Sequence, residues 1–316
     1  MLDMDKDSVI FVAGSSGMVG SAIVRLLKKL DYKNIVTRTS KEVDLRNADE
    51  VNRFFLMEKP EYVFLAAAKV GGIHANNVNR GEFIRDNLLI QTNVIHACHV
   101  FNVKKMIFLG SSCIYPRDCP QPIKEEYLLT GPLEETNKPY AIAKIAGIEM
   151  CDAYRKQYGC NFVTVMPTNL SGPNDNYDPN TSHVFAAMIR KMYEAKKYNK
   201  LEVVLWGTGN ARRDFLHADD LARALLVIMD KYDGSDPINI GYGKDITIKD
   251  FAKIVKDVVG YDGNVVFDTN MPDGTLVKIM DCSKIHALGW NPAISLEQNV
   301  KLVVSDFSER YDIYCT

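Results

Sequence analysis

A glycine-rich turn near the start of the chain constrains the fold more than any other feature. Residues 14–20 follow the apolar run Ser8–Ala13, which predicts a β-strand, and apolar residues then recur at helical spacing from Met18 to Leu30. A strand that passes through such a turn into a helix presents free N–H groups and positive potential to a pyrophosphate. We therefore expect the turn to bind a dinucleotide through Gly14, Ser15, Ser16, Gly17, Met18, Val19 and Gly20.

Strands and helices alternate along the rest of the first half of the chain. We expect strands at Asn34–Thr37, Tyr62–Ala68, Lys105–Gly110 and Asn161–Met166, and helices at Ala48–Lys59, Asp86–Phe101 and Tyr140–Tyr158. This order is typical of right-handed crossovers between parallel strands. The fold class predicted is therefore α/β, with a doubly wound parallel sheet of the Rossmann type and a second, smaller α/β substrate lobe.

The alternation breaks near Asn169, where prolines, glycines and amide side chains follow one another. A helix at Val184–Lys197, a strand at Val203–Trp206 and a helix at Asp219–Asp230 come next. We assign residues 1–170 and 212–240 to the dinucleotide-binding domain, and residues 171–211 and 241–316 to the substrate-binding lobe.

Composition excludes several classes of function. Lys plus Arg number 38 and Asp plus Glu 40, so the net charge of −2 offers no basic field for nucleic acid. The cysteines form no CxxC pair and the histidines show no ligand spacing with carboxylates, so we expect no metal site. No apolar run approaches the roughly 20 residues of a membrane span, and the acidic N-terminus is unlike a secretory signal, so we expect a cytoplasmic protein.

Three residues outside the glycine turn suggest proton-transfer chemistry. Tyr140 and Lys144 are four residues apart on an expected helix, so the ammonium of Lys144 could stabilise the phenolate of Tyr140 and lower the pKa of that tyrosine from its ordinary value of about 10. Ser111 follows an expected strand at the carboxyl edge of the sheet, where its hydroxyl could bind a substrate carbonyl. The Tyr–Lys spacing alone would be common by chance, but the glycine turn upstream gives it meaning.

The end of the second expected strand bears on the choice of dinucleotide. An NAD-specific protein usually places an acid there for the ribose 2′-hydroxyl, whereas this chain has Arg38. Arg38 favours the 2′-phosphate of NADP(H), although a solvated surface cation is an equally good interpretation.

Taken together, the glycine turn, Ala66–Ala68, Ser111 and the Tyr140–Lys144 pair resemble the extended short-chain dehydrogenase/reductases. Residues 66–73, 109–116, 139–147 and 166–170 are similar to the GDP-L-fucose synthase family. That family epimerises and then reduces GDP-4-keto-6-deoxy-D-mannose with NADPH, giving GDP-L-fucose.

The resemblance implies roles for individual residues. Cys113 would be the base of the epimerisation and His183 the acid, while Ser111 polarises the C4 carbonyl and Tyr140 protonates its oxygen during reduction. Residues implied to contact NADP(H), besides the turn and Arg38, are Asp44, Ala67, Lys144, Pro167, Asn169, Leu170 and His183. Residues implied to bind the GDP-sugar are Lys191, Trp206, Arg213 and, as a weaker candidate, Lys278.

Two departures from the family pattern and two alternatives stay open. Ser40 replaces a second arginine expected after Arg38, and Lys191 replaces an arginine of the substrate region. One alternative is a sugar-nucleotide 4-epimerase or 4,6-dehydratase of the same fold, although residues 112–114 lack the acid pair of a dehydratase. The other is a non-catalytic NADP-binding scaffold, which would be expected to have lost Tyr140, Lys144 or Ser111. The resemblance also implies a homodimer formed through the helix Asp86–Phe101.

Overall fold

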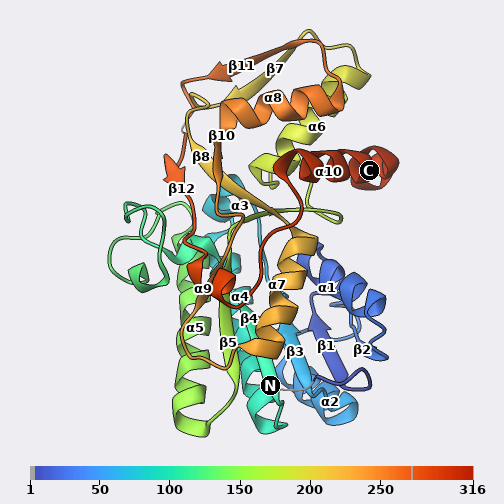
Figure 1. Ribbon diagram of the computed structural model, residues 1–316, viewed down its shortest axis with the longest axis vertical. Coiled ribbons are helices and arrows are strands. Elements are labelled where there is room, and N and C mark those ends of the chain that lie inside the picture. Colours follow the sequence, from blue (N-terminus) through green and yellow to red (C-terminus); the bar gives the residue numbers. More distant parts are fainter. Residues whose placement is uncertain (1–3, 272, 316) are drawn as a thin grey trace.

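The computed structural model describes residues 4–271 and 273–315, and its larger half is built on a six-stranded parallel sheet (Figure 1). The strands are β1 (Val9–Ala13), β2 (Asn34–Val36), β3 (Tyr62–Leu65), β4 (Lys105–Leu109), β5 (Phe162–Pro167) and β9 (Ile238–Ile240). Their order is β2-β1-β3-β4-β5-β9. The chain reverses direction of winding between β1 and β3, the position at which doubly wound sheets bind ligands. The predicted fold class is confirmed.

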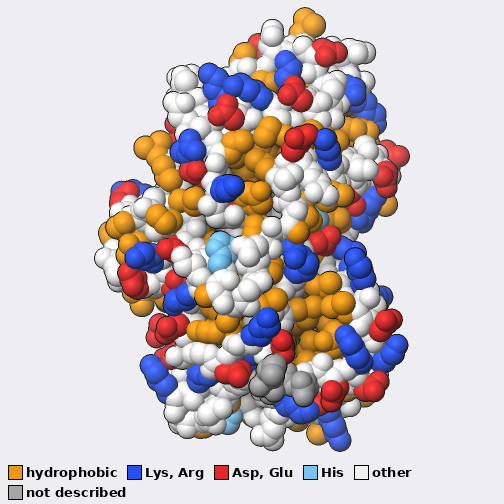
Figure 2. Space-filling view, viewed as in Figure 1, with side chains coloured by type: hydrophobic (Ala, Val, Ile, Leu, Met, Phe, Trp, Pro, Cys, Tyr) orange, Lys and Arg blue, Asp and Glu red, His pale blue; other side chains and the backbone are white. Residues whose placement is uncertain are grey.

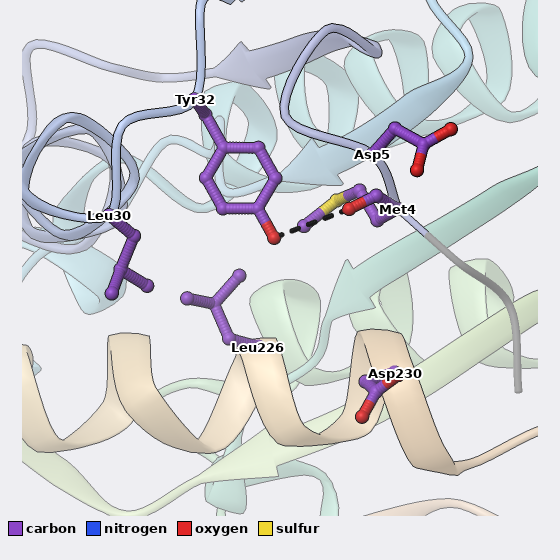
Figure 3. Close-up of a pocket in the computed structure, with 6 residues that line it drawn as sticks. All are labelled: Met4, Asp5, Leu30, Tyr32, Leu226 and Asp230. Carbon is purple, nitrogen blue, oxygen red and sulfur yellow. Dashed lines mark hydrogen bonds between the residues drawn. The ribbon is translucent and has the colours of Figure 1, made fainter.

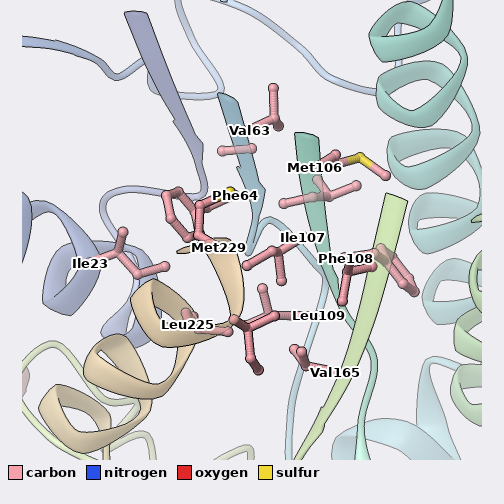
Figure 4. Close-up of a cluster of buried hydrophobic side chains, with 14 of the residues drawn as sticks. Ile23, Val63, Phe64, Met106, Ile107, Phe108, Leu109, Val165, Leu225 and Met229 are labelled. Carbon is pink, nitrogen blue, oxygen red and sulfur yellow. The ribbon is translucent and has the colours of Figure 1, made fainter. Parts of the chain in front are cut away.

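Helices cover both faces of this sheet. On one face α1 (Met18–Lys29) packs against α7 (Ala218–Lys231), and on the other α4 (Arg80–Val100) packs against α5 (Lys138–Tyr158) and α2 (Ala48–Glu58). Because both faces are covered, β3, β4 and β5 are buried along their whole length, as parallel strands require. Figure 4 shows Leu225 and Met229 of α7 beside Ile107 and Leu109 of β4 in this core.

The remaining elements form a smaller unit at the top of Figure 1. Strand β8 (Arg212–His217) pairs with β6 (Asn169–Ser171), β10 (Asp245–Thr247) and β12 (Val277–Lys278), while β7 (Glu202–Trp206) pairs with β11 (Asn264–Asp268). The helices are α6 (Val184–Lys197), α8 (Ile248–Val259), α10 (Leu296–Glu309) and α11 (Tyr311–Cys315). A second core forms here, in which Phe251 packs against Phe185 and Phe215 with ring centroids 4.8 and 4.6 Å away.

The structure differs from the sequence-based expectation in three places. Helix α4 begins at Arg80 rather than Asp86, and a short helix, α3 (Ile73–Val78), precedes it. Asn169–Ser171 forms β6 where we expected only a break, because it adds to β8. Helix α9 (Ser283–Ala287) belongs to the stretch that we assign to the substrate-binding lobe. It nevertheless packs against β9, and its Ile285 lies in the first core. The division into domains stays a prediction.

A buried asparagine anchors the long irregular stretch between Tyr115 and Pro139. The hydroxyl of Tyr115 donates to Asn239 Oδ1 at 2.6 Å, and Asn239 Nδ2 donates to the carbonyl of Ile123 at 2.9 Å. The backbone N–H of Asn239 donates to Glu125 Oε1 at 3.0 Å. These bonds tie the segment, with its 3₁₀ turns η1 (Ser112–Ile114) and η2 (Glu125–Tyr127), to strand β9.

A buried lysine closes the C-terminal end of α7. Lys105, at the start of β4, is fully buried, and its Nζ donates to the carbonyls of Ile228, Met229 and Tyr232 at 2.9, 2.8 and 2.8 Å. Asp233 supplies a counter-charge at 3.2 Å. The last carbonyls of a helix have no partner within the helix, so this ammonium satisfies them and complements the negative end of the helix dipole.

Charged side chains are mixed over the surface. Figure 2 shows basic and acidic groups interspersed on one face, with apolar surface between them. Within residues 4–271 and 273–315, no helix is both long and apolar enough to cross a bilayer. The same ranges contain no cluster of three or more His, Cys, Asp or Glu side chains arranged to hold a metal ion.

Candidate active site

The glycine turn is as tight as pyrophosphate binding requires. Gly14 has φ = +80°, and a Cβ on it would lie 2.7 Å from the backbone nitrogen of Ala67, which follows β3. A Cβ on Gly20 would lie 2.1 Å from the carbonyl oxygen of Gly14. Gly17 precedes α1 and brings no side chain to its N-terminus, so the first N–H groups of that helix stay open to an anion. The turn at the β1–β3 reversal therefore fits a dinucleotide.

We expect Gly20→Ala to weaken dinucleotide binding at least about 10-fold, because the new methyl group would force the turn apart, and about 1.4 kcal/mol of lost contact suffices for that factor. Fluorescence titration with NADPH would measure the change. Gly81→Ala is the matched control, because a Cβ at Gly81 meets nothing within 4 Å. Equal affinity of Gly20→Ala and wild type would contradict the placement of the pyrophosphate.

Arg38 and Asp44 both have partners of opposite charge. Arg38 lies just after β2, donates to the carbonyl of Thr37 at 2.7 Å and forms an ion pair with Glu58 at the end of α2. Asp44 accepts from Arg46 at 2.9 Å, and this hydrogen bond lowers the pKa of the Asp44 carboxyl. Arg38 is thus held at the edge of the sheet by an acid at the end of α2.

Ser111, Cys113 and Tyr140 lie together at the carboxyl end of β4. Ser111 Oγ accepts from the backbone N–H of Cys113 at 3.2 Å, which fixes the thiol two residues beyond the hydroxyl. Tyr140, near the start of α5, is 9% exposed and packs edge-on against Phe83 at a centroid distance of 6.4 Å. Burial raises the pKa of Tyr140, the nearby Cys113 raises it further, and a hydrogen bond with Ser111 opposes both. The phenol therefore keeps its proton at neutral pH.

Lys144 lies one helical turn beyond Tyr140 and is buried. Its Nζ donates to the carbonyl of Leu109, the last residue of β4, at 2.7 Å, and lies 4.8 Å from the centroid of the Phe108 ring. Burial lowers the pKa of Lys144 to about 7. The ammonium is thus directed to the end of β4, and the expected lowering of the Tyr140 pKa by Lys144 is not found, because burial raises that pKa.

Cys113 and His183 come from different halves of the chain, and Lys278 lies near both. Lys278 Nζ is 3.6 Å from Cys113 Sγ. His183 directly precedes α6, and the residue as a whole is exposed. Its imidazole is nevertheless surrounded by protein atoms, and this desolvation lowers the pKa of the ring, which the charge of Lys278 lowers further. The loop before His183 is fixed by Gly72, whose N–H donates to the carbonyl of Thr181 at 2.7 Å.

The residues expected to bind substrate lie in the smaller unit. Arg213 of β8 pairs in register with Lys278 of β12, and its guanidinium donates to the carbonyl of Thr275 at 2.6 Å. Burial lowers the pKa of Arg213. Lys191 of α6 donates to the carbonyl of Val204 at 3.1 Å, on the strand that ends at Trp206. Trp206 is 56% exposed, so its indole face is free to stack on a planar ring.

Asn169 and Leu170 lie on β6, which follows β5 and its last residue, Pro167. Asn169 Nδ2 donates to the carbonyl of Asp214 at 3.0 Å, which links the end of the large sheet to β8. Leu170 packs against the first core. These three residues and Ala67 therefore line the carboxyl edge of the sheet on either side of Ser111.

A cavity of about 270 Å³ lies away from this edge (Figure 3). It is lined by Met4, Asp5, Leu30, Tyr32, Leu226 and Asp230. These residues lie around the C-terminal ends of α1 and α7 and include none of the predicted site residues.

Comparison with known proteins identifies the family. Residues 10–241 match the NAD dependent epimerase/dehydratase family. The chain belongs to that family. A curated relative in Arabidopsis thaliana, "Putative GDP-L-fucose synthase 2", is 56% identical over 94% of this chain and 90% of its own. The Escherichia coli GDP-L-fucose synthase is 47% identical over 96% of this chain and 97% of its own.

Solved structures of family members give the same result. A GDP-L-fucose synthetase from Naegleria fowleri bound to NADP superposes with a TM-score of 0.91 at 33% identity, covering 98% of this chain and 96% of that one. A GDP-6-OMe-4-keto-L-xylo-heptose reductase from C. jejuni superposes with a TM-score of 0.91 at 40% identity, covering 97% and 99%. The predicted resemblance to GDP-L-fucose synthases is confirmed, as is the prediction that this family member is an enzyme that uses a nicotinamide dinucleotide.

Two features of the site were missed in the sequence. One is Gly72, where a Cβ would lie 2.5 Å from the carbonyl oxygen of Ser182, so only glycine allows the loop before His183 to approach. The signal for it in the sequence is the paired glycine Gly71-Gly72. The other is the contact of Lys278 with Cys113, which no spacing pattern in the sequence indicates.

Proposed function

We propose that this protein catalyses the NADPH-dependent 3,5-epimerisation and 4-reduction of GDP-4-keto-6-deoxy-D-mannose, giving GDP-L-fucose. The observation that carries the proposal is the grouping of Ser111, Cys113 and Tyr140 at one edge of a dinucleotide-binding sheet, with Lys278 against the thiol. A reductase needs only the serine and the tyrosine, whereas a thiol beside them adds a base. Curated relatives 47–56% identical to this chain carry the name GDP-L-fucose synthase.

Epimerisation needs a base and an acid near two carbon atoms. The C4 ketone of the substrate makes the hydrogens on C3 and C5 removable, and the thiolate of Cys113 would take them. His183 would return a proton from the opposite face of the sugar. The lowered pKa of His183 makes its imidazolium a stronger acid, while reducing the fraction that is protonated at pH 7.

Reduction uses the same position of the sugar. NADPH, when bound, supplies the hydride that C4 accepts. Ser111 would donate a hydrogen bond to the C4 oxygen, and Tyr140 would deliver the proton, because burial and the neighbouring Cys113 keep its phenol protonated. Lys144 would turn from the Leu109 carbonyl to the nicotinamide ribose. The glycine turn, Asp44, Ala67, Pro167, Asn169 and Leu170 would hold the rest of the dinucleotide.

The experiment that tests the proposal follows NADPH oxidation by absorbance in deuterated water, with deuterium at C3 and C5 of the product read by NMR. We expect oxidation together with label at both carbons. Oxidation without label would instead indicate a 4-keto reductase, a second candidate favoured because a solved neighbour at 40% identity is named a reductase. No oxidation would refute the proposal.

We further propose that NADPH is preferred over NADH through Arg38, which lies after β2 beside Glu58. Arg38→Gln should raise the KM for NADPH about 10-fold or more and leave that for NADH unchanged, because only NADPH carries the 2′-phosphate. Steady-state kinetics with both dinucleotides would measure this. A proportional change for both would show that Arg38 acts on the fold and not on the phosphate. Ser40 in place of a second arginine should keep the preference moderate.

The substrate would lie across the smaller unit. We propose that Arg213 and Lys191 bind the diphosphate and that Trp206 stacks on the guanine, with residues 171–211 and 241–316 forming the substrate lobe. We also propose a homodimer through α4 and α5, which expose Leu89, Val100 and Ile142. Sedimentation equilibrium that returned only the monomer mass of 35.5 kDa would exclude it. A cytoplasmic location stays a prediction.

A further inference from the structure

Two cations from neighbouring strands approach the Cys113 thiol. Lys278 lies on β12 with Nζ 3.6 Å from Cys113 Sγ, and Arg213 lies opposite it in register on β8. The guanidinium of Arg213 is held by the carbonyls of Thr275 and Arg212 at 2.6 and 2.8 Å. It is near enough to Cys113 for the two to interact electrostatically. Lys278 is half-buried, so solvent screens its contact with the thiol only partly.

We propose that Lys278 is a positioning residue for proton abstraction, because its ammonium, in contact with Cys113 Sγ, stabilises the thiolate that forms when Cys113 gives up its proton. The inference rests on the proposed function in one respect, namely that Cys113 is the base. Only the thiolate can accept a proton from carbon, and a cation in contact with the sulfur stabilises that form over the thiol.

The other groups that face Cys113 fit this arrangement. Tyr140 packs against it from α5, and the charge at Cys113 helps to keep the phenol protonated. Ser111, before it in the chain, binds its backbone N–H. A negative charge on Cys113 therefore favours the protonated phenol needed for the later reduction, while Lys278 and Arg213 lie near enough to balance that charge.

The competing interpretation is that Lys278 serves only to bind the diphosphate of the substrate. In that case its removal would raise the KM for substrate and leave the thiol of the substrate-free protein unchanged. The reactivity of Cys113 without substrate separates the two interpretations, and it does not depend on the catalysed reaction.

The test is alkylation of the substrate-free protein with iodoacetamide across pH 5 to 10, with Cys113 followed by mass spectrometry of its peptide. The thiolate sulfur displaces iodide, so the rate follows the thiolate fraction. We expect Lys278→Met to move the midpoint of the rate profile upward by about one pH unit, in line with the effect of an opposite charge at this range. Lys278→Arg should restore most of the shift.

Two controls show whether the effect is local. Lys284→Met removes another lysine of the same region, one whose Nζ lies 3.5 Å from Asp236, and should leave the Cys113 profile unchanged. Cys160, a half-buried thiol elsewhere, should alkylate at the same rate in every variant.

An unchanged Cys113 midpoint in Lys278→Met, or an equal shift at Cys160, would overturn the proposal. If Lys278→Met shifts the Cys113 midpoint but the wild-type protein shows no deuterium exchange at C3 and C5, the Lys278–Cys113 contact is supported and the proposed function is refuted.

Discussion

Tyr140→Phe should keep deuterium exchange at C3 and C5 of the substrate and lose hydride transfer, by about 10²- to 10⁴-fold in kcat. The phenylalanine ring fills the same pocket against Phe83, so the Cys113 side of the site is left intact. What disappears is the buried hydroxyl, whose raised pKa keeps a proton ready for the C4 oxygen. Stopped-flow absorbance of NADPH and NMR of substrate recovered from deuterated water would measure the two activities separately.

Cys113→Ser is the matched variant, and its result should be the reverse. Exchange should fall by a similar factor because a serine hydroxyl at this position is far less acidic than a thiol, while binding of NADPH stays normal. The backbone N–H of residue 113 can still donate to Ser111, so the turn should survive. If both variants lost both activities equally, the division of labour between thiol and phenol would be wrong.

Lys105→Met should cost about 3 kcal/mol of the free energy of unfolding, a large loss for a single side chain. Three hydrogen bonds to carbonyls within a buried site would be lost, at about 1 kcal/mol each. The melting temperature should fall by about 5 to 10 °C. Thermal unfolding followed by circular dichroism would measure it.

The neighbouring residue provides the control. Lys104 is exposed and forms an ion pair with Glu61, so Lys104→Met should change the stability by no more than about 0.5 kcal/mol. Melting of the two variants at the same temperature would show that the buried ammonium contributes nothing beyond a surface charge.

Most of the fold could be predicted because its signals are local. The helix predicted at Val184–Lys197 has the same bounds as α6, since apolar residues repeat along it at helical spacing. The start of α4 could not be placed because the residues it buries include Asp86, Asn87 and Gln91, so the apolar pattern that marks a buried helix face is weak. Strand β12 has only two residues, too few for any periodicity.

The candidate site divides in the same way. Ser111, Cys113 and Tyr140 could be placed together from the sequence, because each follows or begins an element whose position in a parallel sheet is fixed by topology. Lys278 could not be placed against Cys113, since 165 residues separate them and the lysine reaches the thiol through tertiary contacts such as the pairing of β12 with β8. The Gly72–Thr181 contact is likewise a meeting of two loops.

The Lys105 contact also has a consequence for folding during synthesis on the ribosome. The carbonyls that receive its ammonium follow it by 123 to 127 residues, and β9, which completes the sheet, follows them. At about 5 to 20 residues per second, β4 is made roughly 6 to 25 seconds before the carbonyls that Lys105 binds. Meanwhile β6, α6, β7 and β8 of the smaller unit are synthesised, and its other elements follow β9. The larger half is thus not a unit that finishes first, and a nascent chain carries a sheet whose α1 face still lacks α7, with Lys105 without its carbonyl partners, until residues 218–240 are made.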